Sequence, residues 1–137
     1  MTENLYGSMM IAASGMRAQG YRLKVVAQNI ANANSTSDRT GGDPYRRKVV
    51  TFANVLDRQL DAELVKVSKL KEDQSAFKLV YDPHHPAANK DGFVKMPNVN
   101  QLVEMMDMRE AQRSYEANLN IVEAAKSMMS RTIGLLR

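Results

Sequence analysis

Both ends of the chain carry apolar residues at alternating steps of four and three positions, and this spacing limits the possible folds more than any other feature. In the N-terminal section, residues 3–33, the positions are Leu5, Met9, Ala12, Met16, Gln19, Leu23, Val26, Ile30 and Ala33. Such alternation is the seam of a coiled coil, narrower than the apolar face of an ordinary globular helix. Gly7, Gly15 and Gly20 each weaken this helix by about 1 kcal/mol relative to alanine. The section therefore predicts an amphipathic helix that needs a partner surface.

The C-terminal section, residues 98–137, repeats the spacing over a longer stretch. Its seam is Met105, Met108, Gln112, Tyr115, Leu119, Val122, Lys126, Met129, Ile133 and Leu136. Other apolar residues widen the stripe: Leu102, Met106, Ala117, Ile121, Ala124 and Met128. Asn98 or Asn100 is placed to cap a helix that begins after Pro97. A helix of this length exceeds what one small core can cover.

The middle section, residues 34–97, lacks the four-three spacing of the two ends. It opens with a polar, glycine-containing loop over residues 34–44 and continues with alternating segments that predict strands at Tyr45–Phe52, Leu64–Leu70, Phe77–Tyr81 and Phe93–Met96. Residues 53–62 fit neither pattern clearly. We therefore expect a mainly α fold with a small β-rich middle segment. Its long terminal helices, 1–33 and 98–137, would pair as a coiled-coil-like hairpin within one structural unit and be completed on assembly.

The charge of the chain does not indicate a nucleic-acid partner. There are 19 Lys and Arg against 15 Asp and Glu, and the excess is spread along the sequence. The one basic run, Arg46-Arg47-Lys48, lies in a predicted strand, and a solvated strand face explains it better than a phosphate-tracking surface.

No segment reaches the roughly 20 apolar residues of a membrane-spanning helix. The residues before the first apolar stretch include Glu3 but no Lys or Arg, unlike a signal peptide. We therefore expect no membrane insertion, and either residence in the cytoplasm or export without a cleaved leader.

Catalytic chemistry has little support in the sequence. Cysteine is absent, which excludes thiolate metal sites and thiol nucleophiles. One constellation could suggest a metal or a general base: Asp82, His84, His85 and Asp91. Adjacent histidines in an extended segment point to opposite sides, and the flanking Pro83 and Pro86 favour a rigid turn. We expect no enzyme, no cofactor and no bound metal.

Two interpretations of the terminal stripes remain open. They could form the core of an intramolecular helical hairpin, as in a non-filamentous adaptor or binding protein. Alternatively, they could also pack against neighbouring subunits, and heterologous contacts of that kind generate filaments. The position of the stripes at the extreme termini, and the apolar residues on more than one side of the C-terminal helix, favour assembly.

Three blocks of residues resemble the bacterial flagellar axial protein family over nearly the whole chain. The first is Gln28-Asn29-Ile30-Ala31-Asn32-Ala33-Asn34-Ser35-Thr36, followed by Tyr45-Arg46-Arg47-Lys48. The second runs from His85-Pro86-Ala87-Ala88-Asn89 to Gly92-Phe93-Val94. The third begins with Pro97-Asn98-Val99-Asn100 and continues through Glu104-Met105, Arg113-Ser114-Tyr115 and Met128-Met129. With so short a chain, these blocks resemble the proximal-rod members in particular, apart from a longer loop at Ser37–Asp43.

The resemblance implies a structural subunit of the flagellar basal-body rod, the drive shaft that passes torque to the hook and encloses an export channel. It implies assembly in the periplasm after uncleaved type III export. The implied partners are the chain itself, other rod proteins, the ring and rod-junction proteins, and the export apparatus. The expected assembly interface comprises Leu5, Met9, Met16, Leu23, Val26, Asn29, Ile30, Asn32, Met105, Met108, Tyr115, Leu119, Val122, Met129 and Ile133.

Overall fold

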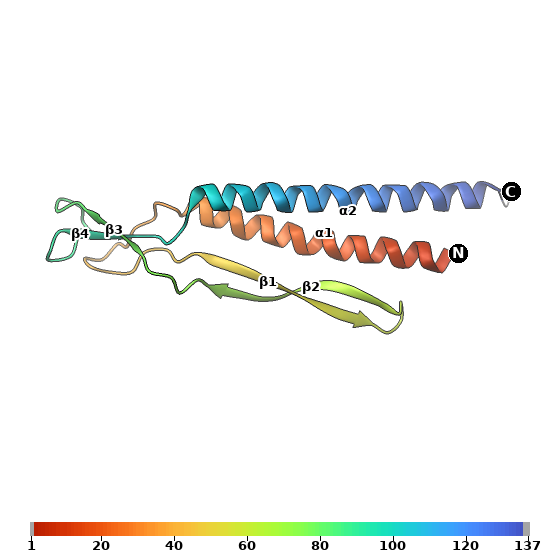
Figure 1. Ribbon diagram of the computed structural model, residues 1–137, viewed down its shortest axis with the longest axis horizontal. Helices are drawn as coiled ribbons and strands as arrows, with labels where there is room; N and C mark the ends of the chain where they lie inside the picture. Colours follow the sequence, from red (N-terminus) through yellow and green to blue (C-terminus); the bar gives the residue numbers. More distant parts are fainter. Residues whose placement is uncertain (1, 136–137) are drawn as a thin grey trace. The chain divides into compact units, whose positions relative to one another are not determined.

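The computed structural model describes residues 2–135, and its elements follow the predicted order (Figure 1). They are α1 (Thr2–Ala31), β1 (Lys48–Asp57), β2 (Ala62–Glu72), β3 (Lys78–Tyr81), β4 (Phe93–Met96) and α2 (Gln101–Leu135). The strands form two small sheets, β1 with β2 and β3 with β4. Two long helices on either side of a small β region in the sequence confirm the predicted fold class.

The chain divides into two compact units, and each takes residues from all three sequence sections. The hairpin unit comprises Met1–Leu23, Thr51–Lys69 and Arg109–Arg137. The junction unit comprises Lys24–Val50 and Leu70–Met108. Each unit thus contains part of α1, part of α2 and part of the β1–β2 sheet.

In the hairpin unit, α1 lies beside α2 in the opposite direction (Figure 1). The helices approach closely at Gly15, where an added Cβ would lie only 2.7 Å from the side-chain nitrogen of Asn118. On another side, the Ser14 hydroxyl accepts a hydrogen bond from the Val65 amide of β2 at 3.2 Å. The buried residues of this unit are mostly small: Ala12, Ala18, Ala111, Ala125, Ser14 and Leu64.

The β1–β2 hairpin resolves the ambiguous segment 53–62. Strand β1 continues to Asp57, and a turn leads into β2 with Asp61 at a positive φ of 45°. The Thr51 hydroxyl donates to the Lys69 carbonyl across the sheet at 3.2 Å. From Val49 to Leu56, β1 has no charged residue, proline or glycine. Among the described residues no further strand pairs with its other edge.

In the junction unit, β3 and β4 pair antiparallel, with Val80 opposite Val94 and Tyr81 opposite Phe93. Val94 packs with Ala87, Ala88 and Met96 in a small apolar cluster. The connection between the strands needs Gly92, which has a φ of 81°. A side chain there would also lie 2.9 Å from the Tyr81 ring.

The loop at Ser37–Asp43 is held against the segment between β3 and β4. The Gly41 amide donates to the Ala87 carbonyl at 3.2 Å, and Lys95 of β4 pairs with Asp43 at 2.9 Å. His85 also has a structural role, because its Nδ1 accepts a hydrogen bond from the Ala87 amide at 3.0 Å.

Polar side chains cap the C-terminal end of α1 and the N-terminal end of α2. Asn32 follows α1 and donates back to the Gln28 carbonyl at 2.9 Å, so the helix ends two residues before the predicted limit. Of the two candidate caps for α2, Asn100 is the N-cap, because its side-chain oxygen accepts a hydrogen bond from the Leu102 amide at 3.1 Å. The Asn98 side chain instead bonds the Arg47 amide and the Asp73 carbonyl.

Candidate assembly surfaces and the polar junction

Asn29, at the end of α1, lies at the centre of the junction unit with 1% of its surface exposed. Its amide nitrogen donates to the Lys48 carbonyl at 2.8 Å and to the Glu104 carboxylate at 3.0 Å. Its amide oxygen accepts from the Tyr45 hydroxyl at 2.9 Å and from the Lys48 amide at 3.0 Å. The side chain thus connects α1, the start of β1 and the start of α2, with no hydrogen-bonding capacity left over.

Glu104 and Arg47 form the charged half of this cluster. Glu104 is fully buried on the first turn of α2, and its second carboxylate oxygen accepts from Nε of Arg47. Arg47 also lies 3.5 Å from Asp73 and 3.7 Å from Asp107. A buried carboxylate is tolerated where it is paired and hydrogen-bonded, as here. We call Asn29, Tyr45, Arg47, Asp73, Glu104 and Asp107 the polar junction.

The surroundings shift three pKa values in this cluster. Burial raises the pKa of the Tyr45 phenol above 10.0, and the charges of Glu104 and Glu72 add to the effect. Burial lowers the pKa of Arg47, but the hydrogen bond and charge of Glu104, together with the charges of Asp73 and Asp107, leave a net increase. Hydrogen bonds from Ser75 hold the pKa of Asp73 below 3.8. Near neutral pH the junction therefore keeps a neutral tyrosine, a charged arginine and a charged aspartate.

Arg46 and Asn98 extend the same network. The Arg46 guanidinium lies 4.2 Å from the centre of the Phe77 ring and donates to the Asp73 carbonyl at 3.1 Å. Asn98 accepts from the Arg47 amide at 2.8 Å and donates to the Asp73 carbonyl at 2.9 Å. The prediction of a solvated strand face for Arg46-Arg47-Lys48 is therefore wrong. The first two residues precede β1, and their side chains have partners from distant segments.

The predicted seam residues of α1 are all buried or half-buried, whereas those of α2 include both half-buried and exposed residues. Leu5, Met9, Met16, Leu23, Ile30 and Asn32 are half-buried, and Val26 and Asn29 are buried. On α2, Met108, Tyr115, Val122 and Met129 are half-buried, but Met105, Leu119 and Ile133 are exposed. Asn29 lies inside the junction unit, so we assign it to the polar junction rather than to a surface that a neighbour contacts.

The inward stripe of α2 is made of different residues from those predicted. In the hairpin unit its fully buried members are Ala111 and Ala125, with Asn118 between them against Gly15. Five larger apolar residues of this unit are exposed, from 37% to 88%: Leu119, Ile121, Met128, Ile133 and Leu135. In the junction unit Leu102, Met105 and Met106 are more than half exposed. We call this exposed apolar set the outer face of α2.

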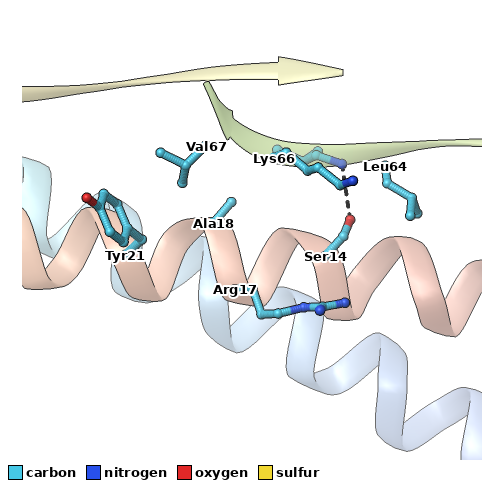
Figure 2. Close-up of a pocket in the computed structure, with 8 residues that line it drawn as sticks. Ser14, Arg17, Ala18, Tyr21, Leu64, Lys66 and Val67 are labelled. Carbon is cyan, nitrogen blue, oxygen red and sulfur yellow. Dashed lines mark hydrogen bonds between the residues drawn. The ribbon is translucent and has the colours of Figure 1, made fainter. Parts of the chain in front are cut away.

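A second candidate surface is a groove between α1 and β2 in the hairpin unit. Figure 2 shows Ser14, Ala18 and Tyr21 of α1 turned towards Leu64 and Val67 of β2, with Arg17 and Lys66 also lining the space. The groove encloses about 350 Å³. Its lining is mainly apolar.

Residues 2–135 meet the requirements of neither a membrane-spanning helix nor a metal site. None of the described helices combines the length and apolarity needed to cross a membrane. In the same part of the chain, no three acidic or histidine side chains gather closely enough to hold a metal ion.

The terminal segments match two models of known families. Residues 9–37 match the family described as flagella basal body rod protein, and residues 90–135 match the C-terminal family of the flagellar basal body rod FlgEFG proteins. The first match covers most of α1, and the second covers β4 and α2. These matches define the class as flagellar rod proteins.

Full-length relatives narrow the class further. The chain is 52% identical over 133 residues to the flagellar basal-body rod protein FlgC of Agrobacterium fabrum, covering 97% of this chain and 96% of that protein. It is 40% identical to FlgC of Bacillus subtilis, covering 93% and 95%, and 44% identical to FlgC of Salmonella typhimurium, covering 91% and 92%. The chain belongs to the FlgC family of flagellar basal-body rod proteins. It is a structural subunit of the rod, which confirms the resemblance.

The sequence reasoning missed the polar junction as a site. The resemblance blocks contained Asn29, Tyr45, Arg47, Asn98 and Glu104, but spacing alone did not bring them together. Asn29 and Glu104 are 75 positions apart. The available signal was chemical, since Glu104 is the one acid in the first turn of α2 and is flanked by Val103 and Met105.

Proposed function

We propose that the chain assembles with copies of itself and with other rod proteins in the proximal, periplasmic part of the rod. The supporting observation is the outer face of α2, where large apolar residues are exposed, whereas the buried residues of the same helix in the hairpin unit are Ala111 and Ala125. Exposed apolar surface gathered on one element marks a site of protein interaction. Neighbouring subunits would cover it.

In this proposal the terminal helices pack around a central export channel, and the β-containing middle segment faces outward. The subunit passes torque mechanically and catalyses no reaction. Before assembly it is a substrate of the flagellar type III export apparatus, and afterwards it contacts ring and rod-junction proteins of the basal body.

The test replaces the chromosomal copy with an affinity-tagged one and analyses purified basal bodies by mass spectrometry. We expect the tagged protein in the rod fraction, and loss of both rod and swimming when the gene is deleted. A swimming deletion strain, or basal bodies that lack the protein, would refute the proposal.

A further inference from the structure

The groove between α1 and β2 has a floor suited to an apolar side chain. Ala18 and Leu64 are 3% and 7% exposed, and Tyr21 and Val67 complete the walls. The Ser14 hydroxyl already donates to the Ile11 carbonyl at 2.7 Å and accepts from the Val65 amide at 3.2 Å. The floor therefore has no polar group that needs a ligand, and about 350 Å³ of space remains open.

Positive charge borders this apolar space. Arg17 of α1 and Lys66 of β2 are among the residues that line the groove, and both are exposed. No acidic residue lines the groove, and within the described part of the chain neither cation has an ion-pair partner. A ligand for this groove should combine an apolar side chain with carboxylates on either side.

The outer face of α2 presents that combination. Glu116, Leu119 and Glu123 follow one another at steps of three and four, so they lie on one face of the helix. Leu119 is 37% exposed, and both glutamates are exposed. Among residues 2–135 neither glutamate has an ion-pair partner, and segment 114–125 contains no Lys or Arg.

We infer that the groove receives the Glu116–Glu123 segment of α2 from a second copy of the chain. Leu119 of that copy enters the apolar space, and its two glutamates face Arg17 and Lys66. This is a helix-in-groove contact with complementary charge. The inference rests on the proposed assembly function and specifies which two surfaces meet.

The proposed contact joins two different surfaces, so it is heterologous. The groove and the α2 segment are different surfaces of one chain, so each copy offers one surface to a neighbour and the other to the next copy. Contacts of this heterologous kind extend into rings or open helical arrays rather than closing in a dimer. One helix in one groove is small compared with stable protein interfaces, so the test belongs in assembled rods.

A charge exchange tests the pairing. Arg17→Glu with Lys66→Glu should reduce incorporation into basal bodies by about tenfold or more, because attraction becomes repulsion. Glu116→Lys with Glu123→Lys should do the same. All four substitutions together restore opposite charges and should recover incorporation and swimming. The matched control, Lys24→Glu with Lys69→Glu, changes exposed lysines of the same two elements outside the groove and should have little effect.

Disulfide cross-linking provides a second readout, because the natural chain has no cysteine. Lys66→Cys combined with Glu123→Cys should give cross-linked multimers in isolated rods under mild oxidation. Lys69→Cys with Glu123→Cys serves as the control and should give about tenfold fewer.

The outcomes separate the inference from the proposed function. If wild-type chain is in the rod but the fourfold variant is not rescued, the groove does not bind a second copy. That result, which another rod protein in the groove would also produce, overturns the inference. Equal cross-linking of the two cysteine pairs overturns it as well. Absence of wild-type chain from the rod refutes the proposed function itself.

Discussion

Asn29 takes the place of a strand residue at the start of β1. Its side chain bonds both the amide and the carbonyl of Lys48, as the backbone of a neighbouring strand would. The remaining bonds reach Tyr45 and Glu104. Three segments that are remote in the sequence therefore depend on one buried amide, and losing any partner leaves polar atoms unsatisfied.

Glu104→Gln tests the charged part of the polar junction. The substitution leaves Arg47 without its buried counter-charge, and the free energy of unfolding should fall by about 3 kcal/mol. Glu110→Gln is the matched control on the same helix, because Glu110 pairs with Arg22 at 3.5 Å while 68% exposed. Its effect should stay below about 0.5 kcal/mol. Urea unfolding measures both, and equal effects would show that the burial of Glu104 contributes nothing.

The lowered pKa of Asp73 predicts an acid-dependent loss of stability. A carboxyl whose pKa is lower in the folded state stabilises the fold above its unfolded value of about 3.9. That contribution disappears as the pH falls through the still lower folded pKa. NMR titration of the Asp73 carboxyl should give a midpoint below 3.8 in the folded chain. Ser75→Ala should raise it, since the Ser75 amide and hydroxyl are its main donors, and an unshifted midpoint would contradict the assignment.

The sequence allowed α2 to be predicted as a helix with an apolar stripe, but not its orientation. Large residues such as Leu119 and Met105 gave the strongest periodic signal, yet the buried positions are Ala111 and Ala125. The physical reason lies on α1, where Gly15 lets Asn118 approach closely. A side chain at Gly15 would collide with Asn118, so the two helices meet there through small residues. Exposed residues such as Leu119 and Met105 are left for surfaces outside the chain, and hydropathy alone cannot distinguish them from residues that pack within it.

Leu119→Asp separates assembly from folding at the level of this helix. Leu119 is 37% exposed, so the variant should still fold, with a small fall in melting temperature, while swimming fails. Ala125→Asp is the control, because Ala125 is 5% exposed and a buried unpaired charge should cost about 3 kcal/mol. If Leu119→Asp unfolds the isolated chain, its side chain belongs to the core. If it swims normally, the outer face is dispensable.

The strands were predicted less well than the helices. Alternation identified Phe93–Met96 correctly, whereas Tyr45–Arg47 alternates without forming a strand. Tyr45 and Arg47 are held by Asn29, Asn98 and Glu104, and Arg46 donates to the Asp73 carbonyl. Such tertiary contacts override a local pattern. Most of the candidate assembly residues followed from periodicity, and Asn29 and Asn32 from the family resemblance. The polar junction needed the fold to bring distant residues together.

Across the whole molecule, the two units differ in what holds them together. The junction unit contains a buried hydrogen-bond network and a Val94 cluster, whereas the hairpin unit buries mainly alanines. Local stability follows such differences in packing. In the free chain, we expect hydrogen exchange to be slowest around Val25, Val26 and Lys48. It should be faster along α2 after Asn120. Assembly into rods should then slow exchange in that part of α2, and equal protection throughout the free chain would contradict this prediction.

One edge of strand β1 makes the purified subunit prone to aggregate before assembly. Its Val49–Leu56 stretch has no charge, proline or glycine, and one edge has no strand partner among the described residues. Short, uncharged segments of high β-propensity at an open edge are the usual seeds of cross-β aggregation. Purified protein should therefore form thioflavin-binding fibrils on storage at high concentration. Val55→Lys should delay them, because Val55 is 40% exposed and the new charge interrupts the apolar stretch. The shelf life of the isolated subunit would then depend on one sheet edge rather than on its melting temperature.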